Sequence, residues 1–371
     1  MQIAAPLSLR SRFAPAVLPA GLACGWLGTA LLAGGFFTAT AAPLALATLS
    51  VLLFLAAVGR LRLPSVGVIA LAALAGWTAT AGVLAHSSAR PLILPILYAS
   101  ALWLAEHADG TELLRMLRLA ILALSLVALA ARLLSLAPTA GQTSSRLQWP
   151  ITYSNGLGLV AAAGVLLWLT RLDRPSLAAA AVCATAMILT FSRSAIFGCA
   201  LALLVKAVVS RRRLPSAGLA TAAIVCVAVG VFLAPGMLRS FAASSPDSRD
   251  VHRLAMLSGH GRTALWRAAW EQGTEHPVIG VGPGGFSAPS GERNAHSLEL
   301  QTYAETGVVG VLVLLAFLAY GIWVTRLDAT AAAAVALWIT VSAVDWDWQL
   351  PAATLPAIFA IASCRPTRPL R

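Results

Sequence analysis

Long apolar runs, separated by short polar breaks, fill most of this 371-residue chain. Hydrophobic residues make up 59% of it and charged residues only 11%, whereas soluble domains average about 45–50% and about 25%. A water-soluble fold of this size could not bury so much apolar surface. A helix of about 20 apolar residues crosses the hydrocarbon core of a bilayer. The pattern therefore predicts an all-α, polytopic transmembrane helical bundle.

About twelve spans follow from the apolar runs and the breakers between them, and tilting or merging lowers the count to ten or eleven. The first run is too long for a cleaved signal peptide and is interpreted as a span. We expect one polytopic domain, residues 1–371. The spans lie near 14–37, 41–58, 65–85, 91–105, 117–136, 154–170, 176–191, 194–210, 217–235, 307–325, 329–344 and 351–364.

The basic residues orient these spans. With the N-terminus inside, cytoplasmic segments hold sixteen of the 26 Lys and Arg residues, as the positive-inside rule requires. The short outer segments keep only Arg90, Arg132, Arg146 and Arg193. Both termini are therefore predicted to be cytoplasmic. Since the net charge of +12 is explained by topology, no nucleic-acid partner is expected.

The five cysteines all lie in apolar segments, without a CxxC motif or an evident pairing. A disulfide framework or a zinc site is therefore not expected. The sequence suggests no metal and no cofactor.

One outer loop, residues 236–295 between the ninth and tenth spans, differs from the rest in composition. It carries six arginines, three histidines and five acids. Loops of this length inside a compact architecture are usually functional or disordered. Its aromatic residues and a helix-like segment argue against disorder, so we expect the chemistry here.

Within this loop, residues 261–273 (GRTALWRAAWEQG) predict a short amphipathic helix. Arg262, Trp266 and Trp270 are spaced i, i+4, i+8 and share one face. Tryptophan is a common anchor at the membrane interface, which would hold Arg262 at headgroup depth. The spacing alone leaves Arg262 either functional or a solvated surface residue.

The following segment, HPVIGVGPGGF at 276–286, contains a GxGxxG spacing. A dinucleotide-binding fingerprint requires a preceding strand and a helix that opens on its last glycine. Pro283 interrupts the motif, and the inferred outer face offers little nucleotide. We interpret the segment as a tight turn against the membrane.

Two further polar positions stand next to apolar spans. His296 precedes the span of residues 307–325; if the chain is helical there, Glu299 shares a face with it and could orient the imidazole. Arg193, in FSRSAIFG, has no other charge between Arg174 and Lys206. Charge in such a place is costly and marks a functional site by default. The alternatives are a polar histidine near water and an arginine that snorkels to lipid headgroups.

These segments, in this order, resemble the O-antigen ligase and polymerase-like family of bacterial membrane proteins. The resemblance rests on an SR turn, a GR…W…P…GVGPG-like stretch and H-S…L…AE-x-G-x-x-G at the start of a span. It covers roughly Trp149 to Val324. The matching elements are Ser192–Arg193, Gly261–Arg262 with Trp266, Pro277, Gly280–Gly284, His296, Ala304–Glu305, Gly307 and Gly310, and WPITYSNGLG at 149–158 with Asn155.

The resemblance implies a GT-C-like fold in the bacterial inner membrane and an inverting, metal-independent glycosyltransferase whose active site is extracytoplasmic. The donor is a glycan on undecaprenyl diphosphate, the acceptor a hydroxyl of a glycan or glycolipid, and membrane lipids surround both. Arginine grips phosphate bidentately, and a histidine with a pKa near 6.5 suits a general base. The implied catalytic residues are His296, Arg262 and Arg193, and we expect substrate contacts from Arg146, Asn155, Trp266, Glu299 and Glu305.

The sequence leaves three functions open. A ligase joins a finished glycan to an acceptor, whereas a Wzy-type polymerase of the same family extends the polymer on the lipid. Some relatives are labelled bicarbonate transporters, but the chain lacks a convincing internal repeat with a site at mid-membrane. Two features depart from the family pattern: Glu299 replaces a frequent aromatic residue, and DWDW at 345–348 has no family role.

Overall fold

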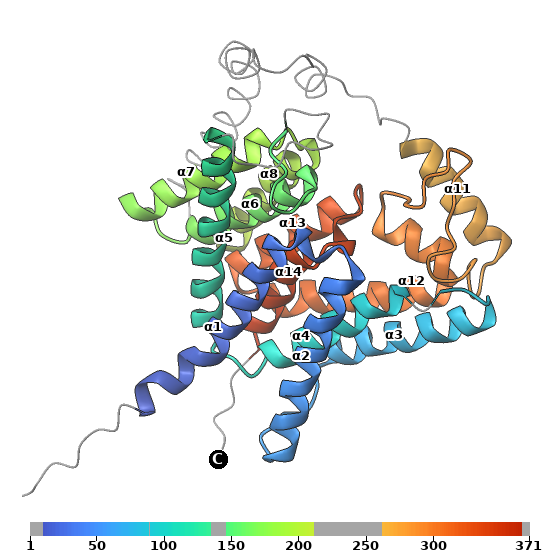
Figure 1. Cartoon of the computed structure of the whole chain (residues 1–371), viewed down its shortest axis with the longest axis horizontal. Coiled ribbons are helices and arrows are strands. Elements are labelled where there is room, and N and C mark those ends of the chain that lie inside the picture. The colour runs from blue at the N-terminus through green and yellow to red at the C-terminus, as the bar shows by residue number, and fades with distance from the viewer. Residues whose placement is uncertain (1–9, 89, 135–145, 211–261, 366–371) are drawn as a thin grey trace, which may run out of the picture.

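A computed structural model describes residues 10–88, 90–134, 146–210 and 262–365 (Figure 1). These residues form helices and loops without a strand, which confirms the all-α prediction for this part of the chain. The helices are α1 (Arg10–Leu31), α2 (Thr38–Ala57), α3 (Val66–Leu84), α4 (Ile93–Ala105), α5 (Gly110–Leu133), α6 (Ser154–Trp168), α7 (Arg174–Leu189), α8 (Arg193–Ser210), α11 (Arg262–Glu275), α12 (Leu298–Thr325), α13 (Ala329–Ser342) and α14 (Pro351–Ser363), with short 3-10 turns η1 (Ala33–Gly35), η2 (Arg90–Leu92) and η3 (Asp347–Gln349).

Five of the helices, α2, α3, α5, α8 and α12, are long and apolar enough to cross a membrane. Six shorter apolar helices coincide with other predicted spans. The predicted span at 217–235 and residues 236–261 of the predicted loop lie outside the described residues. The count of twelve spans, the GT-C class and the sidedness therefore stay predictions.

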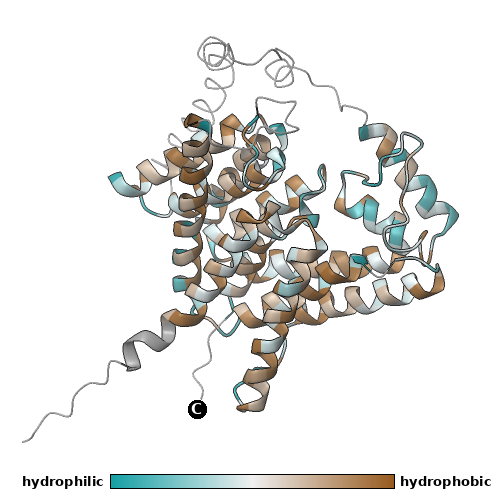
Figure 2. Ribbon diagram, viewed as in Figure 1, coloured by the Kyte–Doolittle hydropathy of each residue, from teal (hydrophilic) through white to brown (hydrophobic). Residues whose placement is uncertain are grey.

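Two helices rich in small residues form the centre of the bundle. Every residue of α6 is buried, and so is α14 from Pro351 to Ala362. α14 contacts α13, α4, α5 and α6 and lies at the middle of the bundle in Figure 1. Alanine and glycine allow this close approach of helix backbones, as is usual in membranes. Large apolar side chains such as Leu53 and Phe54 are instead exposed, and Figure 2 shows apolar residues on the outside of the outer helices.

The helix α12 is broken at Gly307, which has φ +66° and ψ −166°. The loop that follows α11 enters this break and pairs with it backbone to backbone. Val281 N–H donates to the Ala304 carbonyl, and Val308 N–H donates to the Pro277 carbonyl, both over 2.8 Å. Partners of this kind satisfy the polar groups that a broken helix frees in a membrane. The GxGxxG segment is thus a tight turn, as predicted, packed against α12.

The opposite end of α12 carries a second polar cluster. The buried carboxylate of Glu106 pairs with Arg365, while Arg62 Nη1 donates to the Glu106 carbonyl over 3.0 Å. Tyr320 of α12 interacts with both Glu106 and Arg365. This cluster unites segments predicted to be cytoplasmic, and it lies roughly 20 Å along α12 from the break at Gly307, at 1.5 Å per residue.

Gly307→Ala should destabilise the protein, because a Cβ at this position would collide with the backbone of Val278 and because positive φ strains an L residue. We expect a loss of at least about 2 kcal/mol in the free energy of unfolding. Thermal unfolding in detergent measures it. Gly76→Ala is the matched control: Gly76 lies within α3 with nothing near its Cβ position, so its replacement should not lower the melting temperature. Equal effects of the two variants would contradict the docking of the loop.

Candidate active site

Three segments that are far apart in the sequence meet at one carboxylate, that of Asp345. This residue follows α13, and its side chain is 0% exposed. Its Oδ1 accepts hydrogen bonds from the Tyr153 hydroxyl over 2.6 Å and from the backbone N–H of Trp346 over 2.9 Å. The same oxygen lies 3.1 Å from Nδ1 of His296. One oxygen thus connects the segment before α6 with the segment before α12.

The second oxygen of Asp345 contacts the cationic side of the cluster. Arg262, the first residue of α11, donates from Nη2 to Oδ2 over 3.0 Å and from Nη1 to the Val344 carbonyl over 2.5 Å. Asn155 donates to Oδ2 over 2.5 Å, and its own carbonyl oxygen accepts from Arg146 Nη2 over 2.5 Å. Asn155 therefore joins the arginine at 146 to the buried carboxylate.

These contacts keep Asp345 ionised. Burial would raise its pKa, but the hydrogen bond from His296, the charge of Arg262 and the hydrogen bond from Tyr153 together lower the pKa below its ordinary value. An ionised carboxylate only accepts hydrogen bonds. The proton between His296 and Asp345 is therefore on Nδ1 of the imidazole, so in the neutral form of the ring the lone pair is on Nε2.

Asp347, two residues further on, has the opposite character. It is fully buried, and neither of its carboxyl oxygens has a hydrogen-bond partner among the described residues. Burial, followed by the negative charge of Asp345, raises its pKa well above the ordinary value. The pair of acids thus carries one negative charge.

The backbone next to the site is strained in three places. His296, Thr152 and Phe191 have positive φ angles of 51°, 65° and 49°. Each residue is in the site or next to a residue of it: Thr152 precedes Tyr153, and Phe191 lies in the turn that leads to Arg193. Such conformations cost about 1–3 kcal/mol each and cluster at functional sites. Here the strained backbone sets the direction of the side chain of His296 and of the residues that follow Thr152 and Phe191.

His296 is held at the start of α12 by several neighbours. Its N–H donates to the Asn294 side chain over 2.8 Å, and its carbonyl accepts from Trp266 Nε1 over 3.4 Å. Ser297 caps α12 by accepting from Leu300 N–H. The imidazole side chain remains 21% exposed, so a substrate can reach it.

The structure brings most of the predicted residues together. Arg146, Asn155, Arg262 and His296 belong to the Asp345 network, and Trp266 contacts the backbone of His296. Arg193 begins α8, directly after a turn in which the Thr190 carbonyl accepts from Arg146 Nε over 2.8 Å.

Two predicted substrate contacts have other partners here. The carboxylate on the imidazole is Asp345, so the expectation that Glu299 orients His296 is wrong. Glu299 accepts from the Ser297 hydroxyl over 3.3 Å, because the first turn of α12 directs it toward its own cap. Glu305 is buried, accepts from Gln301 over 2.5 Å and interacts with the backbone of Gly284 and Phe286 in the glycine-rich turn.

Sequence reasoning did not assign Asp345 and Tyr153 to the site. The signal for Asp345 was two acids in an apolar segment of a chain with only 14 Asp and Glu residues. A carboxylate in such a place requires cationic or hydrogen-bonding partners, and Arg262 and His296 are these partners.

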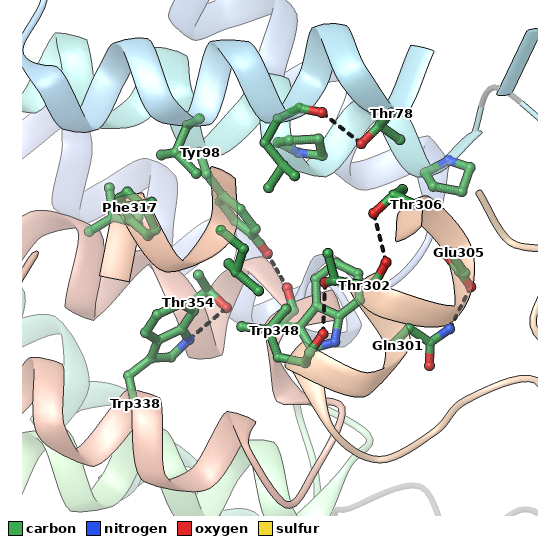
Figure 3. Close-up of a pocket in the computed structure, with 17 residues that line it drawn as sticks. Thr78, Tyr98, Gln301, Thr302, Glu305, Thr306, Phe317, Trp338, Trp348 and Thr354 are labelled. Carbon is green, nitrogen blue, oxygen red and sulfur yellow. Dashed lines mark hydrogen bonds between the residues drawn. The ribbon is translucent and has the colours of Figure 1, made fainter. Parts of the chain in front are cut away.

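A small cavity of about 70 Å³ lies beside the first turns of α12 (Figure 3). Its wall is apolar on the side of Leu71, Leu314 and Phe317, while polar side chains of α12 form another part. Figure 3 shows the Gln301–Glu305 contact at one end and the hydrogen bond from Tyr98 to the Trp348 carbonyl near the middle. The DWDW segment therefore contributes to both places, with Trp348 in the cavity wall and Asp345 in the cluster.

Residues 177–315 match the protein family described as O-Antigen ligase. The match covers 139 of the 371 residues of the chain. No curated protein matches the chain. The predicted resemblance is thereby confirmed, and together with the apolar helices it supports a bacterial membrane protein of polysaccharide biosynthesis that acts in ligase- or polymerase-type glycosyl transfer.

The matched residues include Arg193, Arg262, Trp266, His296, Glu299 and Glu305. Arg146 and Asn155 precede them, and Asp345 follows them. The network thus joins the matched segment to residues on both sides of it. Among the described residues, no group of three or more His, Cys, Asp or Glu side chains is arranged to hold a metal ion.

Asp347→Asn should remove a pH-dependent loss of folding stability. When the pH rises above about 3.9, the ordinary pKa of Asp, the unfolded state loses the Asp347 proton while the native state keeps it. The stability of the protein therefore falls as the pH rises from about 3.9 toward the raised pKa of the native state. The amide has no proton to lose. Its melting temperature should therefore exceed that of wild type increasingly between about pH 4 and pH 7.

Thermal unfolding of the two proteins over this pH range makes the comparison. Asp109→Asn is the control, because this exposed acid caps α5 and asparagine caps a helix as well. A difference between Asp347→Asn and wild type that does not change with pH would contradict a protonated Asp347.

Proposed function

We propose that this protein is a ligase-type glycosyltransferase that moves a glycan from undecaprenyl diphosphate to an acceptor hydroxyl at the outer face of the bacterial inner membrane. One observation carries the proposal: the ionised Asp345 holds the imidazole of His296 and the guanidinium of Arg262 at the same point. A base and a cation side by side are what attack on a sugar diphosphate requires.

In the proposed reaction, the acceptor hydroxyl attacks the anomeric carbon of the first donor sugar. The new C–O bond forms as the bond from that carbon to the diphosphate oxygen breaks, and undecaprenyl diphosphate leaves with the electron pair. The hydroxyl proton passes to Nε2 of His296. Attack opposite the leaving group inverts the anomeric centre. Asp345 stabilises the imidazolium that forms, as a carboxylate behind a catalytic histidine does elsewhere.

The arginines stabilise the leaving group. Charge develops on the diphosphate as the bond breaks, and preorganised cations in a low-dielectric site stabilise it strongly. Arg262 contacts Asp345, Arg146 contacts Asn155 and the Thr190 carbonyl, and Arg193 begins α8 directly after that turn, so three guanidinium groups come from neighbouring segments. Guanidinium groups suit the oxygens of a diphosphate, and the chemistry we propose needs no metal ion.

The remaining predicted residues take two kinds of role. Trp266 and Glu299 are half-buried beside His296, and we assign them to contacts with the sugars. Asn155 and Glu305 are buried and bonded within the protein. They act through the groups that they position, Asn155 on Arg146 and Asp345, and Glu305 on the glycine-rich turn.

The proposal predicts that His296→Ala abolishes glycan transfer while expression and membrane insertion stay normal, because general-base catalysis contributes about 10²–10⁴-fold in rate. The assay uses purified protein in detergent with EDTA and the undecaprenyl-diphosphate-linked glycan of the source bacterium. Transfer by wild type but not by the variant supports the mechanism. The carrier and size of the product separate ligase from polymerase.

Normal transfer by His296→Ala would remove this residue from the mechanism. If wild type transfers nothing to any of a panel of acceptors, the glycosyltransferase proposal itself is contradicted, and the transporter hypothesis is then tested by flux into liposomes.

A further inference from the structure

The face of α11 that carries Arg262 and Trp266 continues for one more turn, to Trp270. This indole is 57% exposed. Its ring lies 5.3 Å from that of Tyr303 on α12, at an interplanar angle of 47°. Tyr303 in turn packs on the bare backbone of Gly273, where a Cβ would collide with its ring. The two aromatic rings therefore form a fixed platform on the outside of the protein.

The surroundings of this platform are polar. α11 exposes Arg267, Glu271, Thr274 and Glu275, and Figure 2 shows hydrophilic residues along this helix. Trp323, at the far end of α12, is similarly exposed at 59%, but it belongs to an apolar helix and stacks with Arg326. Trp323 fits the usual membrane-interface anchor. Trp270 differs in lying on a polar helix and in pairing with a second aromatic ring, that of Tyr303, rather than with a basic side chain.

The order of residues along this face of α11 indicates which ligand binds there. Arg262 contacts Asp345, and Trp266, one turn later, contacts the backbone of His296. Trp270 follows after another turn, about 5–6 Å further on, which is close to the length of one sugar residue in a chain. A donor glycan has the same order: diphosphate, first sugar, following sugars.

Sugar rings stack their C–H faces on indole and phenol rings, whose π faces are electron-rich, and their hydroxyl groups hydrogen-bond to polar neighbours. We propose that Trp270 and Tyr303 form a subsite for the donor glycan, binding the sugars that follow the one that is transferred at its anomeric carbon. This inference rests on the proposed function, since it takes the diphosphate to bind at Arg262.

The test compares Trp270→Ala with Trp323→Ala in the transfer assay. The donor is used at full length and after trimming to its first sugar. Trp270→Ala should raise the KM for the full-length donor about five- to tenfold, as expected for a lost aromatic contact, and leave kcat unchanged. Its KM for the trimmed donor should equal that of wild type. Trp270→Phe should restore most of the affinity, and Trp323→Ala should leave both KM values unchanged.

A binding measurement makes the outcome independent of catalysis. The glycan is released from its lipid by mild acid, and its binding to wild type and Trp270→Ala in detergent is followed by saturation-transfer NMR. Contacts between sugar protons and wild type that are lost in Trp270→Ala support the subsite even if no transfer is seen. Equal signals for both proteins, or none for wild type, overturn it, as does a KM increase that Trp323→Ala shares.

Discussion

The site depends on one buried carboxylate. Asp345 is removed from water, and a charge in such a place persists only when enough partners compensate its desolvation. Here Tyr153, Asn155, Arg262 and His296 do so. The same contacts fix where these side chains lie, because each must stay within hydrogen-bond distance of a carboxylate from a different segment of the chain. Because Asp345 needs these partners, it positions the base His296, the cation of Arg262, and Asn155, which in turn contacts Arg146.

The fold supports this arrangement by interrupting helices where polar groups are needed. α12 breaks at Gly307, and the turn at 277–281 fills the break with its own backbone. That turn sets where α11 lies on α12, and α11 carries Arg262, Trp266 and Trp270. The break therefore affects the site although Gly307 is not part of it. The strained residue His296 belongs to the Asp345 network, and Thr152 directly precedes its member Tyr153, so the network offsets the cost of strain at these two positions.

Much of this could be predicted from the sequence, for physical reasons. Apolar runs of 15 to 20 residues have few structures open to them in a membrane, so the described helices fall near the predicted spans. The i, i+4 spacing likewise predicted the shared face of Arg262 and Trp266. Contacts between distant segments were harder to predict from the sequence. Glu299 is close to His296 in the sequence, whereas Asp345 is close to it only in space. Local spacing cannot indicate which of two carboxylates reaches an imidazole when the partner comes from another helix.

The central claim is that Asp345 acts through His296, and a double-mutant cycle on the rate of glycan transfer tests it most directly. Asp345→Asn, His296→Ala and the double variant are compared with wild type at saturating donor. Residues that work as one unit have strongly non-additive effects on rate. The account predicts that the double variant is no slower than the slower single variant, within about twofold. Rate losses that multiply in the double variant would contradict it.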